Sequence, residues 1–244
     1  MEDYDLTIVE NRPLNGDVYL LKMESKLPFK GLRPGQFAEL QLEGHFLRRP
    51  LSLADFDTYS VTFLYKVVGK GTKELTDYTI LSHIKTIMGL GNGFDIEASK
   101  KPLFVAGGIG IAPFIALGKA FASKGIRPTM IVGFKNKDEV GGLELYSPYM
   151  DIIVTTDDGS YGEKGNPVSY LKSHKVDFDY YYACGPLIML KFLSEAFSNG
   201  ELSLEARMGC GIGACMGCSI MLKDGSAKRI CREGPIFKAE VLSL

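Results

Sequence analysis

The stretch CGIGACMGC, from Cys210 to Cys218, constrains this chain most because it places three of the five cysteines within nine residues. Glycines at positions 209, 211, 213 and 217 disfavour a regular helix or strand there, since each costs about 1 kcal/mol relative to alanine. The stretch is therefore expected to be a loop. A fourth cysteine, Cys231, follows after twelve residues, so the loop and the cysteines need one explanation.

The cysteine spacing is C-x4-C-x2-C with a distant fourth cysteine, which is the plant-type pattern of a [2Fe–2S] cluster. Glycines let backbone N–H groups approach the sulfur atoms and stabilise the negative charge of such a cluster. Structural zinc sites more often use two C-x2-C pairs, of which this segment has one, and zinc in four thiolates remains an alternative. We predict that the metal ligands are Cys210, Cys215, Cys218 and Cys231.

Cysteine usage and charge indicate the compartment. An odd number of cysteines, four of them in the last 35 residues, does not resemble the disulfide framework of a secreted protein. The formal net charge is −1 and no basic block occurs, so there is no electrostatic argument for a nucleic-acid or membrane-surface partner. The N-terminus MEDYDLTIVE has no apolar signal segment, and no run approaches the roughly 20 apolar residues of a membrane span. We expect a cytoplasmic protein.

Two patterns of apolar residues divide the rest of the chain. Up to about residue 98, short alternating runs separated by Gly, Pro and Asn predict an antiparallel barrel or sandwich. These runs cover residues 5–14, 17–25, 36–42 and 60–68. From Lys101, near-continuous apolar strands alternate with helices, which predicts a parallel sheet covered on both faces. The strands are expected at 102–108, 127–134, 150–159 and 178–186, and the helices at 111–125 and 187–200.

The predicted architecture is therefore a β-barrel, an α/β domain and a small cysteine unit. A length of 244 residues exceeds the usual single domain, and a hydrophobic content of 45% provides for more than one core. We place the three domains at residues 1–98, 99–203 and 204–244.

The segment VAGGIGIAPF follows a predicted strand and opens a predicted helix. Gly107, Gly108 and Gly110 would let a diphosphate approach the backbone at the positive end of the helix dipole. Pro113 suits the first helical turn, where its missing N–H has no partner. The pattern G-G-x-G-x-x-P departs from the Rossmann fingerprint, and a tight turn without a ligand is the alternative.

Two further segments carry candidate ligand contacts. Cys184 ends a strand in YYACGPLIML, at the sheet edge where α/β folds bind ligands, and is either a wall of a nicotinamide pocket or a buried apolar thiol. In FLRRPLSLAD, Arg48 and Arg49 suit a bidentate diphosphate contact, although a solvated charged surface is the alternative. The turn at Gly71 and Thr72 could offer N–H groups to phosphate oxygens.

The order of these motifs suggests a family. R-P-L-S, G-K-G-T, G-G-x-G-x-x-P and C-G-P-x-x-M follow one another as in the ferredoxin–NADP reductase superfamily, which the chain resembles. With the C-terminal cysteines added, nearly the whole chain resembles the electron-transfer subunits of NAD-dependent (class 1B) dihydroorotate dehydrogenases. The segments PGQFAEL, GLGNGFD, LEARMGCGIGACMGC and CREGPIF fit those subunits better than the superfamily at large.

The resemblance implies specific cofactor contacts. Arg49 would bind the FAD diphosphate and Ser52 would lie near the reactive edge of the isoalloxazine. Many relatives have Tyr where Leu51 stands, which leaves Tyr65 or another neighbour to stack on the flavin. The implied FAD site comprises Arg49, Pro50, Leu51, Ser52, Leu64, Tyr65, Lys66, Gly71 and Thr72. The implied pyridine-nucleotide site comprises Gly107, Gly108, Gly110, Ala112, Pro113, Cys184, Gly185, Pro186 and Met189.

The nucleotide is expected to be NADH. NADP-specific relatives place serine and basic residues beside the 2′-phosphate, whereas the corresponding stretch here carries Asp157, Asp158 and Glu163. Acidic groups would repel that phosphate. Lys135 and Lys137 leave NADPH open.

The family resemblance implies an electron relay in which no side chain is catalytic. A hydride would pass between the nicotinamide and FAD, and single electrons between FAD and the cluster. The cluster would then serve FMN in a separate subunit that oxidises dihydroorotate in pyrimidine biosynthesis, because this chain is too short to hold its own catalytic barrel. A heterotetramer with two copies of each subunit is expected. Alternatives are a reductase subunit of a ferredoxin–NADP oxidoreductase or hydrogenase complex, and a zinc-stabilised binding protein.

Overall fold

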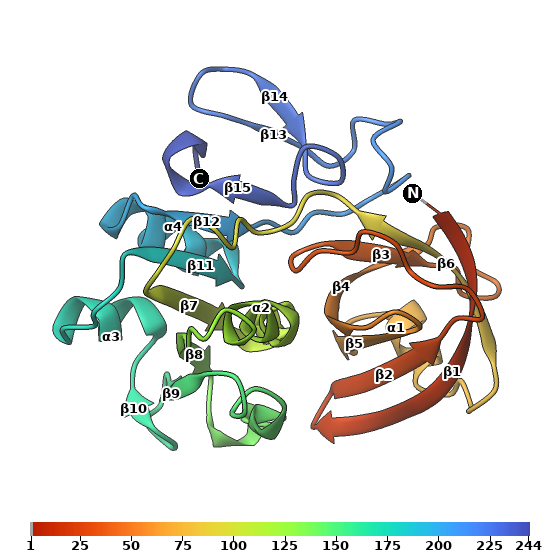
Figure 1. Ribbon diagram of the computed structural model, residues 1–244, viewed down its shortest axis with the longest axis horizontal. Helices are drawn as coiled ribbons and strands as arrows, with labels where there is room; N and C mark the ends of the chain where they lie inside the picture. Colours follow the sequence, from red (N-terminus) through yellow and green to blue (C-terminus); the bar gives the residue numbers. More distant parts are fainter. Residues whose placement is uncertain (1) are drawn as a thin grey trace.

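The N-terminal part is a closed antiparallel barrel. The computed structural model describes residues 2–244, and its first six strands join in the order β1-β2-β5-β4-β3-β6 (Figure 1). They are β1 (Glu2–Asn15), β2 (Val18–Glu24), β3 (Phe37–Leu40), β4 (Arg49–Phe56), β5 (Ser60–Lys66) and β6 (His83–Leu90). Alternate residues of β6, such as Ile84 and Met88, point into the apolar interior, as the period of two requires.

One short helix lies between β5 and β6 in the sequence. Helix α1 (Lys70–Leu75) has Gly69 as its N-cap and contains Gly71 and Thr72, where the sequence suggested only a turn. The Thr72 hydroxyl accepts the N–H groups of Val68 (2.9 Å) and Gly69 (3.1 Å), which satisfies donors at the helix start. The G-K-G-T segment is therefore the first turn of a short helix.

The second part is a seven-stranded sheet with the order β10-β9-β8-β7-β11-β12-β15. Neighbours are parallel except at the β12–β15 edge. The strands are β7 (Pro102–Gly107), β8 (Thr129–Phe134), β9 (Asp151–Thr156), β10 (Glu163–Lys164), β11 (Tyr180–Cys184), β12 (Gly200–Ser203) and β15 (Ile236–Lys238).

Helices cover both faces of this sheet (Figure 1). α2 (Phe114–Ala122) packs on the face that carries Phe104 and Tyr182, whereas α3 (Pro167–Ser173) and α4 (Leu187–Ala196) pack on the face that carries Val105 and Tyr181. Central strands covered on both faces have to be apolar throughout, and every residue of β7 and β11 is buried. The short 3-10 helices are η1 (Gly108–Ile111), η2 (Lys137–Glu139), η3 (Leu143–Leu145) and η4 (Ala239–Val241).

The C-terminal part carries the cysteines. A hairpin of β13 (Ser219–Met221) and β14 (Ala227–Arg229) follows the cysteine loop, and β15 then joins the edge of the seven-stranded sheet. The Asn92 side chain fastens this return, donating to Ile236 O (2.8 Å) and accepting from Ile236 N (2.9 Å). The predicted fold class is confirmed, while the boundaries at 98/99 and 203/204 remain a proposal about independent folding.

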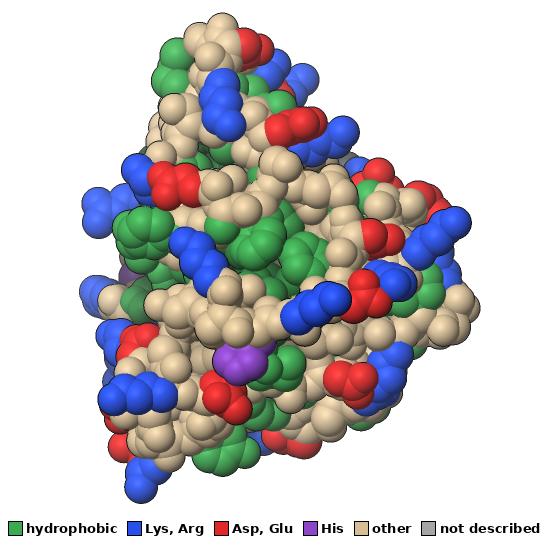
Figure 2. Space-filling view, turned by 90° about the vertical axis from the view of Figure 1, so that its left-hand side faces the viewer, with side chains coloured by type: hydrophobic (Ala, Val, Ile, Leu, Met, Phe, Trp, Pro, Cys, Tyr) green, Lys and Arg blue, Asp and Glu red, His purple; other side chains and the backbone are tan. Residues whose placement is uncertain are grey.

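Side chains also join the barrel to the sheet domain. The Asn15 amide, at the β1–β2 turn, donates to the carbonyls of Asp138 (2.7 Å) and Val140 (2.8 Å). Lys119 on α2 forms an ion pair with Asp55 on β4. Positive and negative side chains are interspersed on the face in Figure 2. Among residues 2–244, no helix combines the length and hydrophobicity needed to cross a bilayer.

Candidate functional site

The first cavity lies where the barrel, the sheet and the C-terminal unit meet. This barrel cavity has a volume of about 350 Å³ and is lined by strand residues of β4 and β5, by Ile109 and Ala112 of the sheet domain, and by the segment that leaves β12. Eight of the nine residues predicted to bind FAD line it: Arg49, Pro50, Leu51, Ser52, Leu64, Tyr65, Lys66 and Thr72. The ninth, Gly71, lies directly beneath Arg49, where a Cβ atom would overlap the guanidinium group.

Tyr65 contributes little open surface to this cavity. Its side chain is 1% exposed, its ring stacks on Tyr19 with a centroid separation of 5.5 Å, and its hydroxyl donates to Asn11 Oδ1 at 3.1 Å. Burial raises the pKa of the phenol well above its ordinary value. The ring is thus part of the barrel core, which leaves the half-buried Leu51 as the more accessible apolar side chain.

A second cavity, of about 490 Å³, lies at the carboxyl ends of β7, β8, β9 and β11. This is the edge at which open α/β sheets bind ligands. Six of the predicted nucleotide residues line this nucleotide cavity: Gly107, Gly108, Gly110, Gly185, Pro186 and Met189. Gly110 has to be glycine because a Cβ there would overlap the carbonyl of Cys184.

The other three predicted nucleotide residues lie elsewhere. Ala112 lines the barrel cavity, and Pro113 is the N-cap of α2. Cys184 is 2% exposed beneath the cavity floor, and burial raises the pKa of its thiol to about 12. It is therefore an apolar, protonated thiol at neutral pH.

Three residues line both cavities: Lys66, Ile109 and Glu205. The two cavities therefore adjoin one another. Sequence reasoning missed Glu205, an exposed residue that lines both cavities. Its position just after a strand end was the available signal.

The acidic stretch predicted to select the nucleotide is only partly at the cavity. Asp157 and Lys135 both line it. Asp158 instead accepts hydrogen bonds from the hydroxyl (2.6 Å) and N–H (2.9 Å) of Ser160, and Glu163 lies on the edge strand β10. Of the three acidic residues, Asp157 is the one placed to contact a ligand.

The four cysteines of the C-terminal unit form two pairs. Cys218 and Cys231 are buried, with their sulfur atoms 3.3 Å apart. Cys210 lies beside Cys215, and its sulfur accepts the N–H groups of Ala214 (3.2 Å) and Cys215 (3.3 Å).

The two pairs differ in electrostatics. Desolvation opposes ionisation of Cys210, but the backbone N–H groups outweigh it and lower the pKa of the thiol to about 6. Desolvation and the neighbouring Cys218 raise the pKa of Cys231 to about 12. Among residues 2–244, no three potential ligands converge on one metal position. Two separate thiol pairs fit a [2Fe–2S] cluster, in which each iron takes two thiolates.

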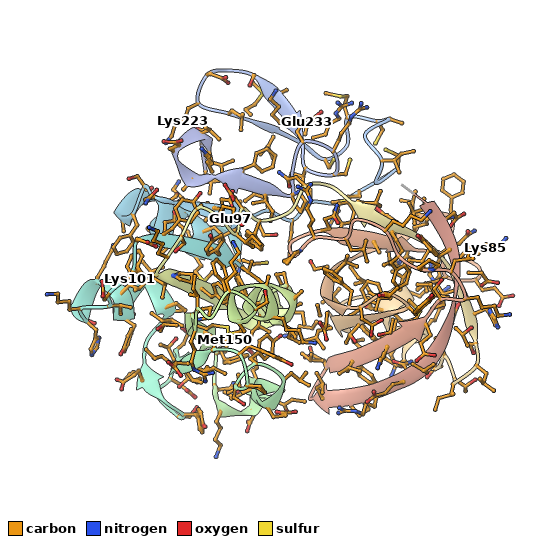
Figure 3. All side chains as sticks on the ribbon, viewed as in Figure 1. Lys85, Glu97, Lys101, Met150, Lys223 and Glu233 are labelled. Atoms are coloured by element: carbon orange, nitrogen blue, oxygen red, sulfur yellow. The ribbon has the colours of Figure 1, made fainter. Side chains whose placement is uncertain are left out.

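Backbone conformation and ion pairs shape the cysteine loop. Gly211 and Gly213 have φ values of +66° and +83°, which favour glycine. Arg229 donates to the Gly213 carbonyl (2.5 Å) and forms a two-point ion pair with Glu233, which lies beside the β13–β14 hairpin (Figure 3). On the other side, Glu39 of the barrel is 2% exposed and touches the Gly211 backbone.

Comparison with known proteins gives the family. The sequence model described as "Iron-sulfur cluster binding domain of dihydroorotate dehydrogenase B" matches residues 205–243. The "Dihydroorotate dehydrogenase B (NAD(+)), electron transfer subunit" of Fusobacterium nucleatum is 36% identical over 253 residues, covering 98% of each chain. That of Bacillus velezensis is also 36% identical and covers 100% of each chain. The chain belongs to the family of dihydroorotate dehydrogenase B electron-transfer subunits.

Membership of the dihydroorotate dehydrogenase B family confirms the resemblance read from the motifs and makes the chain a subunit of an oxidoreductase. A structure of the NADH-dependent reduced ferredoxin–NADP oxidoreductase aligns with a TM-score of 0.88 at 30% identity, over 98% of this chain and 89% of the other. The cytochrome b5 reductase domain of Ulva prolifera nitrate reductase aligns with a TM-score of 0.64 at 15% identity, a likeness of fold alone.

Proposed function

We propose that the chain carries electrons between NADH and a partner flavoprotein, with FAD in the barrel cavity and a [2Fe–2S] cluster in the cysteine loop. The observation that carries this proposal is the continuity of the three sites. Glu205 lines both cavities, Met208 lines the barrel cavity, and Cys210 follows two residues later. A single short segment therefore runs from the nucleotide cavity past the barrel cavity to the first cluster ligand.

The residues of the barrel cavity suit FAD. Arg49 lies over the first turn of α1, where a guanidinium and backbone N–H groups together suit a diphosphate. Leu51, Leu64 and Ile109 give apolar walls that would exclude water from a flavin ring. FAD, when bound, supplies the exchange of two electrons with a nicotinamide and of one electron with a cluster.

The nucleotide cavity supports NAD(H) as the pyridine nucleotide that exchanges electrons with the flavin. Gly107, Gly108 and Gly110 leave the backbone open to a diphosphate, and Asp157 lies at the far strand ends, where an adenosine ribose would reach. A carboxylate there accepts hydrogen bonds from ribose hydroxyls and repels a 2′-phosphate. We therefore expect a preference for NADH over NADPH, which Asp157 favours and which the positive charge of Lys135 in the same cavity opposes.

The partner is proposed to be an FMN-containing catalytic subunit that oxidises dihydroorotate, in a cytoplasmic heterotetramer of two subunits of each kind. The curated relatives are named as subunits of dihydroorotate dehydrogenase B, which implies such a partner. Ile212 and Met216, exposed by 38% and 61%, give the cysteine loop an apolar outer surface on which a partner could dock.

Spectroscopy of the purified chain tests this function. We expect FAD, two irons and two sulfides per chain, bleaching by NADH under anaerobic conditions, and an EPR signal from the reduced cluster. In a separate assay with dihydroorotate and NAD+, orotate should form only when the catalytic subunit is added. Zinc without iron, or a flavin that stays oxidised in excess NADH, would contradict the proposal. The same titration with NADPH measures the nucleotide preference.

A further inference from the structure

A network of four polar side chains, Lys70, Glu74, His45 and Arg49, ends at Arg49, which lines the barrel cavity. Lys70 Nζ is 3.6 Å from Glu74 Oε1, the other carboxylate oxygen of Glu74 contacts His45 Nε2, and His45 Nδ1 is 2.6 Å from Arg49 Nη2. The His45 side chain is 12% exposed, and its backbone is held in a turn by a hydrogen bond to Leu42 O. This network of side chains therefore connects the start of α1 to Arg49, which faces the barrel cavity.

The contacts fix the tautomer of His45. A guanidinium group can only donate, so Nδ1 of the imidazole accepts the hydrogen bond from Arg49. Nε2 then carries the proton and donates it to Glu74. The hydrogen bond from His45 holds the pKa of the Glu74 carboxyl below its usual range, so the acceptor is ionised at neutral pH. Both ring nitrogens are thus engaged within the protein.

The same contacts orient Arg49. One terminal nitrogen is bound to His45, and the other donates to Leu47 O at 2.5 Å. The Nε side of the guanidinium lies against Gly71 in the first turn of α1. A long side chain that is anchored at its far end keeps its remaining donors directed at one place, which lowers the entropy lost when a ligand binds.

We propose that His45, held by Glu74, is a positioning residue that sets Arg49 to receive an organic diphosphate and thereby determines how tightly the chain retains a flavin dinucleotide. The inference rests on the proposed function, in which FAD occupies the barrel cavity. It adds that the contacts of His45 with Arg49 and Glu74 strengthen the binding of ligands that carry a diphosphate and do not affect binding of the flavin ring.

Two amides that mimic one ring nitrogen each provide the decisive variants. In His45→Asn, the side-chain oxygen can replace Nδ1 and keep the contact with Arg49. In His45→Gln, the longer side chain can replace Nε2 and keep the contact with Glu74 only. His45→Ala removes both contacts. His83→Ala is the matched control, since His83 on β6 has Asp5 as its partner at 3.3 Å rather than Arg49 or Glu74.

The experiment measures binding of FAD and of riboflavin to the flavin-depleted full chain by fluorescence quenching. Riboflavin has the same ring but no diphosphate. We expect His45→Ala to weaken FAD binding about tenfold, the effect of one hydrogen bond to a charged group, and to leave riboflavin binding unchanged. His45→Asn should stay within about threefold of the unmodified chain and bind FAD more tightly than His45→Gln. His83→Ala should bind FAD normally.

Several results would overturn the inference. These are an equal loss of FAD and riboflavin affinity, which would mean a general structural role, or His45→Ala binding FAD as tightly as His83→Ala. If His45→Ala does not fold, the FAD affinities of His45→Asn and His45→Gln decide whether His45 positions Arg49. Equal FAD affinities of these two variants would contradict the positioning role. An unmodified chain that binds neither flavin contradicts the proposed function itself, which is a separate outcome.

Discussion

The two cysteine pairs belong to the same loop system yet lie in opposite surroundings. Cys210 and Cys215, here called the outer pair, are partly exposed, and backbone N–H groups face the Cys210 sulfur. Cys218 and Cys231, here called the inner pair, are buried in the apolar core that includes side chains of α3, α4 and β15, and their sulfur atoms are 3.3 Å apart. The Cys210 thiol, with its lowered pKa, is thus anionic at neutral pH before a metal binds, whereas the Cys231 thiol, with its raised pKa, loses its proton only when a metal displaces it.

Each pair also has its own carboxylate. Glu39 approaches the outer pair through Gly211 and is buried, so desolvation raises its pKa to about 7 despite the opposing effect of Arg48. Glu233 lies on the inner side and is paired with Arg229, which lowers its pKa to about 2. The same residue type therefore responds to pH in opposite directions on the two sides of the cysteine loop.

The largest expected effect comes from breaking one pair. Cys215→Ser should abolish the cluster absorption and the iron content while FAD stays bound, because the oxygen is a poor substitute for a thiolate and the barrel cavity lies outside the loop. Visible spectra and iron analysis measure both cofactors in one sample. Simultaneous loss of FAD would show that the loop and the barrel cavity are one folding unit.

Alkylation rates test the electrostatic difference between the pairs. After removal of iron, iodoacetamide at pH 7 should modify Cys210 about 100-fold faster than Cys231, because the thiolate is the nucleophile and Cys231 is also buried. Mass spectrometry of the peptides follows each cysteine separately. Similar alkylation rates of Cys210 and Cys231 would mean that the backbone N–H groups do not lower the pKa of the Cys210 thiol.

Much of this site could be predicted because its parts are contiguous in the sequence. The cysteine spacing, the R-P-L-S strand and the glycine turn after β7 each occupy a few consecutive residues, and their side chains meet at the cavities and the loop. The prediction of a turn at Gly71 and Thr72 was wrong, because both residues belong to the six-residue helix α1, in which the Thr72 hydroxyl accepts the Val68 N–H at the helix start.

The contacts that sequence reasoning missed are those between distant residues. Glu74 reaches His45 across 29 residues, and Glu39 meets Gly211 only because the tail returns over the barrel. The return of β15 to the sheet was equally hidden, since Ile236–Lys238 follows the last cysteine and forms its pairing with β12. No local pattern specifies such pairings, which depend on the packing of the three parts.

A substitution at Glu39 sharpens the contrast in pH response. Its folded pKa of about 7 exceeds the usual 4.5, so the folded state holds more protons than the unfolded state between these values, and stability falls as pH rises through this window. Glu39→Gln removes that loss. Urea unfolding measures the free energy of unfolding of Glu39→Gln minus that of the unmodified protein. This difference should be larger at pH 8 than at pH 4.5 by on the order of 3 kcal/mol.

The exposed Glu43, in the loop that follows β3, supplies the control for this comparison. Glu43→Gln makes the same Glu-to-Gln change at an exposed position, so it measures the part of the effect that does not depend on burial of the carboxyl. A Glu39→Gln profile that parallels that of the unmodified protein would show that Glu39 ionises freely in the folded state.

The smallest expected effect concerns Glu233. Its folded pKa of about 2 lies below the usual 4.5, so its pairing with Arg229 stabilises the fold above that value and is lost as pH falls from about 4.5 towards 2. Both side chains are partly exposed, which screens the pair, and Glu233→Gln should lower the Tm by about 1–2 °C at pH 7. The difference should vanish near pH 2. A larger decrease in Tm at pH 7, accompanied by release of iron, would mean that Arg229 needs Glu233 in order to keep its hydrogen bond to the Gly213 carbonyl. The conformation of the cysteine loop would then depend on this ion pair as well as on the backbone N–H groups that face Cys210.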